Sequence, residues 1–442
     1  MDGMLTKGSQ IPRVVVIGAG FAGLNLTLRL ARSPVHITLI DRRNHHTFQP
    51  LLYQVATAGL SPGEIAAPIR WIVRSRNNIE VLLGEVQDFD LEKRAVKLAD
   101  LEVPYDYLIV ASGASHAYFG HDEWEQFAPG LKTVEDALEI RRRVLLAFEL
   151  AERQAASGKE AMPLNFVIVG GGPTGVELAG TLAEISHQVL ANEFTSIDPK
   201  STRIILLEGG PRLLAAYPED LSHSAEKQLR RLGVDVRTST MVTNVEAAAV
   251  RIGDTQLPSA VTLWAAGVAA SPLGKKLGAP TDRAGRVLVS PDLSIPGHPE
   301  VFVIGDLAAL KDEHGKMVPG VAPAAIQQGK ATARNIQRDL RHEPRQDFHY
   351  INKGNLATIG RAAAIAEFGR IHISGFLAWL SWLFIHIFFL IGFRNRVLVL
   401  IQWAWSYFSY ERGARLITGD QTLPSWTAMH GEEASPKEKA SA

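Results

Sequence analysis

The sequence predicts an α/β protein with two Rossmann-like units and a strongly apolar C-terminal region that we expect to be helical. Two observations predict the Rossmann-like units. A G-x-G-x-x-G fingerprint occurs twice, and each copy lies between an apolar strand pattern and a helical pattern. A third observation predicts the helical region, because no Asp, Glu, Lys or Arg occurs from Ile371 to Phe393. At 442 residues, the chain is long enough for several domains with hydrophobic cores of their own.

Composition excludes several classes of protein. Lys and Arg together number 46, as do Asp and Glu, and this balance argues against nucleic acid as a partner. The sequence contains no cysteine, which excludes disulfides, thiolate metal sites and any dithiol redox centre. The first ten residues contain no apolar segment, so we expect no signal peptide and a cytoplasmic main body.

The first fingerprint follows an apolar strand pattern at 14–17 and consists of Gly18, Gly20 and Gly23. In such a motif the first glycine makes a tight turn, the second lets the backbone approach a pyrophosphate, and the third allows close packing of helix on strand. The next strand pattern ends at Asp41, at the distance where an acid binds a ribose 2′-hydroxyl. We therefore predict a dinucleotide site rather than an ordinary turn.

The second fingerprint repeats this arrangement, with an apolar strand pattern at 166–169 followed by Gly170, Gly172 and Gly175. The strand pattern after it ends at Glu208. Two complete fingerprints predict two bound dinucleotides, and a flavin with a nicotinamide is the pairing that we expect.

Glu208 also bears on the choice of nicotinamide. A carboxylate at that strand end accepts hydrogen bonds from a 2′-hydroxyl but repels a 2′-phosphate, so we expect NADH in preference to NADPH. Arg212 follows shortly after Glu208 and would weaken this preference.

Three further apolar strands, at 105–114, 260–268 and 300–310, end in small-residue turns. With the fingerprints, they resemble in order and kind the flavoproteins with two dinucleotide-binding domains and a glutathione-reductase-like fold, over about residues 11–345. The resemblance implies FAD at the first fingerprint, NAD(P)H at the second, and Asp306 against the ribityl chain of FAD. The other cofactor-binding residues expected in these turns are Ala111, Gly113, Gly267 and Gly305.

The same resemblance sets the expected domain boundaries. They are 11–118 and 290–345 for the two parts of the FAD-binding domain, 119–289 for the inserted NADH-binding domain, 346–422 for a membrane-anchoring region, and 423–442 for a disordered polar tail.

The absence of cysteine restricts where the electrons go. The chain cannot be a glutathione-reductase-like enzyme, a thiol peroxidase or a sulfide:quinone reductase, so the acceptor is external: a quinone, a small protein or oxygen. The segments 41–70, 168–184, 321–336 and 352–368 resemble the type II NADH:quinone oxidoreductases over about residues 12–418. These are single-subunit, FAD-containing dehydrogenases that do not pump protons and that attach to one membrane face. The resemblance also implies a homodimer.

In that family the quinone approaches an A-Q-x-A-x-Q-Q-G segment, which here is 322–329 with Pro323 in place of the first glutamine. The resemblance implies that Gln327 lines a quinone pocket. It also implies that Glu177, in the helix after the second fingerprint, points towards the nicotinamide and flavin, with a solvent-facing helix acid as the alternative. Glu177 and Gln327 are the catalytic candidates, whereas we expect Glu184 to be structural.

Several residues that follow the second strand pattern, which ends at Asp41, could lie beside a cofactor. We interpret His45 and His46 as turn residues beside FAD and expect no metal site, because no third ligand accompanies them. Phe48, Pro50 and Tyr53 either border the flavin or pack the loop.

The apolar stretch 374–393 is long enough to be a transmembrane helix, a buried core helix or a helix at a membrane surface. Arg394 and Arg396 follow it, and the next stretch, 397–410, is short and rich in Trp and Tyr, with polar residues at helical spacing. Because the arginines disfavour a span and Trp and Tyr favour an interface, we favour two helices lying in one leaflet. This arrangement is a monotopic anchor on the cytoplasmic face of the inner (plasma) membrane.

Together these patterns predict an FAD-dependent NADH:quinone oxidoreductase bound to a lipid bilayer surface. The alternatives are a soluble NADH:acceptor flavoprotein that reduces a ferredoxin-like protein, and a redox-linked regulator that binds both dinucleotides. The sequence leaves open whether the quinone is ubiquinone or menaquinone, and how deep the C-terminal helices lie.

Overall fold

The computed structural model describes residues 11–409, 412–419 and 422–430. They form two compact units, and the chain passes between them more than once. The first unit contains residues up to His46, Ala67–Ser115 and Val268–Asn352. The second contains Thr47–Ala66, His116–Gly267 and the residues from Lys353 onward. The segment 47–66 therefore folds with the second unit, although it follows the first fingerprint in sequence.

The first unit is built on a six-stranded sheet of strand order β20-β21-β9-β1-β2-β5. All pairs are parallel except β20 with β21. The central strand β1 carries Val14, Val15 and Val16, all fully or almost fully buried, as a strand covered on both faces requires. The strands are β1 (Arg13–Ile17), β2 (His36–Asp41), β5 (Ile79–Leu83), β9 (Tyr107–Val110), β20 (Ser294–Ile295) and β21 (His298–Val303).

Two helices of the first unit, α1 (Phe21–Leu30) and α9 (Ala322–Asp339), pack against each other. They approach so closely that a Cβ atom at Gly329 would collide with the carbonyl oxygen of Ala22. The glycine that ends the Q-Q-G sequence is therefore needed for packing. The remaining elements of the unit are α4 (Ile69–Val73), β6 (Asp88–Asp90), β7 (Ala95–Lys97), β8 (Glu102–Pro104), α8 (Leu273–Lys276), β19 (Val287–Leu288), η5 (Gly305–Leu307) and β22 (Ala308–Ala309).

The second unit contains a parallel sheet of order β13-β12-β11-β17. The helix after its fingerprint, α6 (Pro173–Glu184), packs on β23 (Asn355–Gly360), where a Cβ atom at Gly180 would collide with the carbonyl oxygen of Ile359. The sheet and its helices are β11 (Asn165–Val169), β12 (Arg203–Leu207), β13 (Val234–Arg237), β17 (Val261–Trp264), α5 (Val134–Ala156) and α7 (Glu219–Arg231).

The smaller elements of the second unit are η1 (Gln49–Leu51), α2 (Leu52–Ala56), α3 (Pro62–Ile65), η2 (Asp122–Trp124), the π-helix η3 (Ile185–Val189), η4 (Pro199–Ser201), β14 (Asn244–Glu246), β15 (Ala249–Ile252) and β16 (Thr255–Pro258). Two further short strand pairs are β3 (His45–Thr47) with β4 (Ala66–Pro68), and β10 (Ala114–His116) with β18 (Val268–Ala270).

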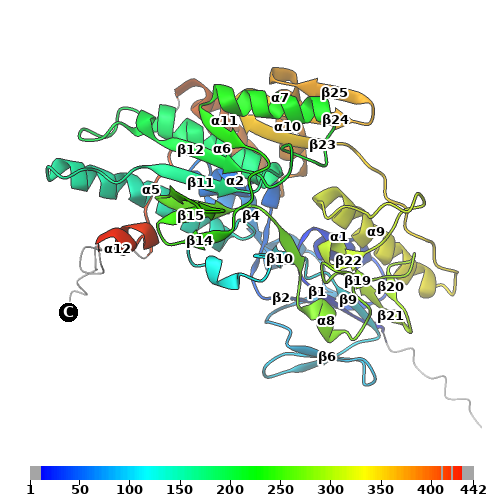
Figure 1. Ribbon diagram of the computed structural model, residues 1–442. Helices are drawn as coiled ribbons and strands as arrows, with labels where there is room; N and C mark the ends of the chain where they lie inside the picture. The colour runs from blue at the N-terminus through cyan, green and yellow to red at the C-terminus, as the bar shows by residue number, and fades with distance from the viewer. Residues whose placement is uncertain (1–10, 410–411, 420–421, 431–442) are drawn as a thin grey trace, which may run out of the picture. The chain divides into compact units, whose positions relative to one another are not determined.

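The C-terminal region continues the second unit with an antiparallel sheet and helices (Figure 1). The sheet contains β23, β24 (Ala363–Phe368) and β25 (Ile371–Ser374), and the helices are α10 (Phe376–Phe389), α11 (Phe393–Ser409) and α12 (Pro424–His430). The start of the charge-free run is therefore a strand. The two arginines after the run lie inside α11 rather than in a connecting turn. Within the described ranges, no helix is both long and apolar enough to cross a membrane.

The expected disorder from residue 423 onward is wrong for 424–430, which form α12. Leu423 and Trp426 are buried, the Ser425 hydroxyl donates to the Ala260 carbonyl at 2.6 Å, and the Arg153 guanidinium lies over the Trp426 ring. These contacts give a short polar helix the apolar burial that its composition alone does not suggest. The rest of the predicted tail, 431–442, lies outside the described residues, as does Tyr410 of the Trp- and Tyr-rich stretch.

Candidate functional site

The first fingerprint forms a tight turn against the end of β9. Gly18 has a φ of +95°, and a Cβ atom there would lie 2.5 Å from the carbonyl oxygen of Ala111. A Cβ atom at Gly23 would collide with the carbonyl oxygen of Gly18. Gly20, the N-cap of α1, has no side-chain cap and has open space where a Cβ would lie. The first N–H groups of the helix are therefore accessible to an anion such as a pyrophosphate.

Asp41 is held beside this turn by two backbone donors. The N–H of Ala19 donates to Asp41 Oδ2 at 2.7 Å and the N–H of Arg43 donates to Oδ1 at 2.8 Å. The carboxylate therefore keeps a fixed orientation at the end of β2. A 2′-hydroxyl of a ribose is the kind of donor that its remaining lone pairs can accept.

The residues around this turn suit a large polar cofactor. His46 is buried, its Nδ1 lies 2.7 Å from the Ala19 carbonyl oxygen, and burial lowers its pKa. Twelve buried side-chain polar atoms have no hydrogen-bond partner in the part of the chain that the structure describes, and three of them belong to residues near this turn: His45 Nε2, His46 Nε2 and Ser112 Oγ. Buried polar atoms are normally hydrogen-bonded, so these atoms fit a ligand that supplies the missing partners. FAD meets that requirement.

A second turn of the first unit contains Gly305 and Asp306. Gly305 has a φ of +77°, and its N–H donates to Gln328 Oε1 at 2.6 Å. Gln328 is buried, and sequence reasoning did not identify it. Its place in the Q-Q-G sequence was the available signal. Gly113, also predicted, has a φ of +70° and open space at its Cβ position, and its carbonyl oxygen accepts from the Ser271 N–H at 3.1 Å.

Gln327, the neighbouring residue, is occupied by a backbone contact within the first unit. Its side-chain amide donates to the Ile351 carbonyl at 2.9 Å and accepts from the Ile351 N–H at 3.0 Å. The amide thus fixes the segment that follows α9. A direct contact of Gln327 with quinone remains a prediction, and Pro323 lies in the first turn of α9, where a missing N–H costs little.

The second fingerprint has the same geometry as the first. Gly170 has a φ of +110°, and a Cβ atom there would lie 2.5 Å from the carbonyl carbon of Ala265 at the end of β17. A Cβ atom at Gly175 would collide with the carbonyl oxygen of Gly170. Gly172 is the N-cap of α6, has no side-chain cap and has open space at its Cβ position. The second unit therefore presents a second site for a pyrophosphate.

Glu208 lies beside the second fingerprint as Asp41 does beside the first. The N–H of Gly171 donates to Glu208 Oε2 at 2.6 Å, and the N–H of Gly210 donates to Oε1 at 2.6 Å. The Arg212 guanidinium donates to the carbonyl oxygens of Tyr217 and Ala215, both at 2.8 Å. These carbonyls fix the orientation of the guanidinium, and the preference for NADH over NADPH remains a prediction.

Gly267, the remaining predicted cofactor-binding residue, lies just after β17 in the second unit. Its carbonyl oxygen accepts from the Ala117 N–H at 3.2 Å, and a Cβ atom there would lie 2.7 Å from the ring of Phe119. Phe119 is 70% exposed and has a positive φ of 55°. An exposed aromatic ring on a constrained loop is a candidate contact for a planar ligand, and the sequence contained no signal for it.

Glu177 lies on α6, inside the second unit. Its carboxyl group accepts from the Thr358 N–H, and burial raises its pKa to about 8. The carboxyl group is therefore largely protonated at neutral pH, unlike an ordinary surface acid. A contact of Glu177 with the nicotinamide and flavin remains a prediction.

Glu184 lies at the end of the same helix in a buried ion pair. Arg412 donates to Glu184 Oε2 at 2.9 Å and to the Thr57 carbonyl at 2.9 Å, and the Arg361 N–H donates to Glu184 Oε1. Side-chain exposure is 9% for Arg412 and 11% for Glu184. The pair ties α6 to the C-terminal segment, in keeping with the structural role predicted for Glu184.

The segment 47–66 contacts the two apolar helices. Trp403 of α11 donates from Nε1 to Gln54 Oε1 at 2.7 Å, and Gln402 donates to Glu64. The ring of Phe48 lies edge-on to His386 of α10, with centroids 6.2 Å apart. The sequence left open whether Phe48, Pro50 and Tyr53 border the flavin or pack the loop. In the structure, Phe48 and Tyr53 are buried within the second unit.

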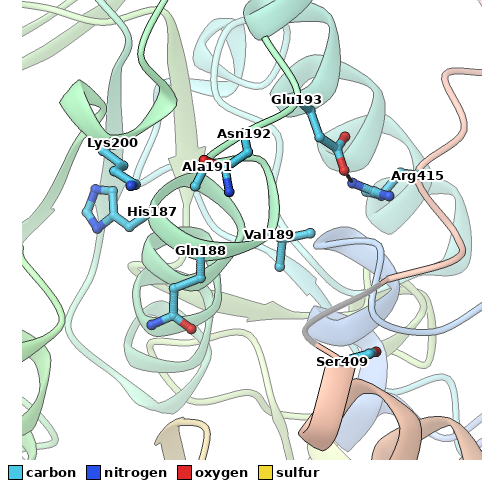
Figure 2. Close-up of a pocket in the computed structure, with 9 residues that line it drawn as sticks. All are labelled: His187, Gln188, Val189, Ala191, Asn192, Glu193, Lys200, Ser409 and Arg415. Atoms are coloured by element: carbon cyan, nitrogen blue, oxygen red, sulfur yellow. Dashed lines mark hydrogen bonds and ion pairs between the residues drawn. The ribbon is translucent and has the colours of Figure 1, made fainter.

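An open cavity of about 510 Å³ lies elsewhere in the second unit (Figure 2). Figure 2 shows Glu193 facing Arg415, with which it forms an ion pair, while Lys200 and His187 lie together at the opposite side. No predicted site residue lines this cavity. Among the described residues, no group of three or more His, Asp or Glu side chains is placed to hold a metal ion.

Two glycine turns of matching geometry, each with a fixed acid beside it, indicate a protein that binds two dinucleotides. The family described as Pyridine nucleotide-disulphide oxidoreductase matches residues 12–329, and the family described as NDH2 C-terminal domain matches residues 352–409. The predicted fold class of two Rossmann-like units is therefore confirmed.

The particular family follows from individual relatives. The chain is 45% identical to the type II NADH:quinone oxidoreductase Ndh of Mycobacterium tuberculosis, over 93% of this chain and 91% of that protein. It is 46% identical to NdhA of the same organism, over 92% and 89%. The structure of NDH2 from Plasmodium falciparum in complex with NADH has the same fold, with a TM-score of 0.82 at 20% identity over 93% of this chain and 100% of that one. The chain belongs to the type II NADH:quinone oxidoreductases, which are FAD-dependent NADH dehydrogenases.

Proposed function

We propose that this chain oxidises NADH at the second fingerprint and delivers the electrons, through FAD at the first, to a quinone dissolved in a lipid membrane. The observation that carries the proposal is the presence of two equivalent pyrophosphate sites in a chain without cysteine. When bound, FAD supplies the hydride-accepting and electron-passing chemistry between NADH and quinone. The protein supplies binding and orientation, and it excludes water.

The residues proposed to hold the cofactors divide between the two units. The pyrophosphate and ribose of FAD would be bound by Gly18, Gly20, Gly23 and Asp41. The rest of the FAD molecule would contact Ala111, Gly113, Gly305 and Asp306. Gly170, Gly172, Gly175, Glu208 and Gly267 would bind NADH. Glu177 and Gln327 are the proposed catalytic contacts.

A direct assay tests this function. Purified holoprotein is mixed with NADH and a short-chain quinone, and absorbance is followed at the NADH band. We expect NADH consumption to depend on quinone. Equal consumption with and without quinone would contradict the proposal, and activity restored only by a ferredoxin-like protein would favour the soluble alternative.

We also propose that α10 and α11 place the protein on a lipid bilayer. Both helices expose large apolar side chains, which water does not favour. They include Phe384, Phe388 and Phe389 on α10 and Phe393, Ile401, Trp405 and Phe408 on α11. Phe408 is 83% exposed and Phe393 is 81% exposed. A monotopic arrangement on the cytoplasmic face of the inner membrane would let a lipid-dissolved quinone reach the protein.

Sedimentation with anionic liposomes tests this placement. Phe388→Glu with Phe408→Glu should abolish cosedimentation and leave NADH:ferricyanide activity intact, because neither side chain is buried. Met241→Glu is the matched control, since Met241 is 67% exposed and lies outside both helices. Unchanged binding of the double variant would exclude this surface. We propose a homodimer on the family resemblance, and light scattering of the purified protein tests it.

A further inference from the structure

Tyr53 is a buried tyrosine of α2 whose hydroxyl has a fixed direction. It is 3% exposed, and Gln54 Nε2 donates to its Oη at 3.0 Å. The orientation of the Gln54 amide is itself set, because Trp403 Nε1 is a donor only and lies 2.7 Å from Gln54 Oε1. Gln54 must therefore present its NH₂ group to Tyr53, and the hydroxyl hydrogen of Tyr53 must point away from Gln54.

That hydrogen has no acceptor among the residues that the structure describes, because the bond from Gln54 is the one hydrogen bond of the Tyr53 hydroxyl there. Burial raises the pKa of Tyr53 well above its ordinary value, and the neighbouring Glu177 raises it further. Glu184 adds to the rise, while Arg412 opposes it. The hydroxyl therefore stays protonated at neutral pH and can donate a hydrogen bond.

The place of Tyr53 within the second unit indicates which ligand would accept this bond. The helix α2 packs on α6, which carries Glu177, and the neighbouring Gln54 bonds to α11, one of the apolar helices. A quinone is an apolar ring with two carbonyl acceptors and no donors, so a buried donor beside an apolar helix suits its head group. Water would satisfy the donor equally well, and the carbonyl band measured below distinguishes the two acceptors.

We propose that Tyr53 donates its hydroxyl hydrogen to a carbonyl oxygen of the quinone and transfers that proton to it during reduction. The inference rests on the proposed function, since it assigns a further catalytic residue to that reaction. Overall, NADH, one proton and quinone give NAD⁺ and quinol. The hydride of NADH supplies the two electrons and one hydrogen of the quinol. The O–H bond of Tyr53 breaks as the other O–H bond of the quinol forms, and Tyr53 then recovers a proton from the solvent.

Removal of the hydroxyl tests the proton transfer. In Tyr53→Phe holoenzyme, we expect kcat with a short-chain quinone to fall about 100-fold, the low end of what a positioned proton donor contributes. Activity with ferricyanide, which accepts electrons without protons, should stay within about twofold. Tyr217→Phe is the matched control, because Tyr217 is also buried near Glu177 but its hydroxyl already donates to the Leu356 carbonyl at 3.0 Å. That variant should keep its quinone activity.

Infrared difference spectroscopy tests the hydrogen bond without turnover. A short-chain quinone labelled with ¹³C at one carbonyl is bound to the oxidised holoenzyme, and the C=O stretch is measured. A donor lowers this stretch, so the band should move to higher wavenumber in Tyr53→Phe and stay unchanged in Tyr217→Phe. A shift in the first variant alone supports the inference.

The outcomes separate the two proposals. If the unaltered protein does not reduce quinone, the proposed function is wrong. If it does, and Tyr53→Phe keeps both its kcat and its carbonyl band, the role of Tyr53 is wrong. Should Tyr53→Phe lose its flavin, 3-fluorotyrosine at position 53 keeps the shape and strengthens the donor. The carbonyl band should then move to lower wavenumber, and an unmoved band would overturn the inference.

Discussion

The helices that follow the two fingerprints begin alike and end differently. In both, the first glycine has a positive φ and the third packs against the carbonyl oxygen of the first. Beyond this shared turn, α1 contains no acidic residue and packs on α9, where Gly329 meets the backbone of Ala22. In contrast, α6 carries two acids and packs on β23 through Gly180.

The difference shows what the fingerprint does and does not determine. The turn is fixed by the need to bring backbone N–H groups to a phosphate, so it is the same in both units. The rest of each helix is shaped by its packing partner. In the second unit the partner belongs to the C-terminal region, and Glu184 at the end of α6 forms its ion pair with Arg412 of that region.

The largest expected effect comes from breaking the ion pair at the end of α6. Arg412→Ala leaves Glu184 buried without its partner, and we expect a loss of about 3–5 kcal/mol in the free energy of unfolding. Denaturant unfolding followed by tryptophan fluorescence measures this loss. Arg412→Leu with Glu184→Leu should recover much of it, because no charge is then buried. Arg341→Ala, which breaks an exposed ion pair with Glu343, should cause no measurable change and serves as the control.

The second expected effect is a dependence of the protein's stability on pH that arises from Glu177 of α6. The helix α1 contains no acidic residue and so makes no such contribution. Burial raises the pKa of Glu177 from an ordinary 4.5 to about 8 in the folded protein, so the folded state binds this proton more tightly than the unfolded state. Stability is therefore lost progressively as pH rises from about 4.5 to about 8. Glu177→Gln should unfold at the same temperature as the unaltered protein at pH 4.5 and at a higher temperature at pH 9. Equal melting temperatures at pH 9 would contradict a buried, protonated Glu177.

A third, smaller effect is the loss of stability that we expect when either of the two packing glycines, Gly180 or Gly329, is replaced by alanine. Gly180→Ala and Gly329→Ala each place a methyl group against a backbone carbonyl that cannot rotate away. We expect each to lower stability by about 1–3 kcal/mol, as overpacking usually does. Gly63→Ala is the control, because nothing lies within 4 Å of its Cβ position. Melting temperatures of the three variants decide the comparison, and an effect at one glycine alone would show that the two contacts differ in rigidity.

The sequence predicted the shared part of the two units and missed the part in which they differ. Glycine spacing and the acid at the strand end are local patterns, so Gly18, Gly170, Asp41 and Glu208 could be identified without a structure. The pairing of Glu184 with Arg412 joins residues far apart in the chain, and no local pattern encodes such a contact.

The helix 424–430 was missed for a related reason. Its residues are polar on average, and they are ordered because Leu423 and Trp426 find a buried surface that only the folded second unit provides. The hydrogen bonds of Gln54 and Gln327 likewise depend on partners that tertiary structure brings to them.

The smallest expected effect concerns the acids that follow both fingerprints. Glu208→Gln keeps an acceptor for a 2′-hydroxyl but removes the charge that repels a 2′-phosphate, so kcat/KM with NADPH should rise about tenfold while that with NADH falls slightly. Steady-state kinetics with both nucleotides measure the ratio. Asp41→Asn is the counterpart in the first unit, and it should weaken flavin retention without changing this ratio, because Asp41 lies beside the other fingerprint. A changed nucleotide preference in Asp41→Asn would mean that the two fingerprints do not hold the cofactors in the proposed order.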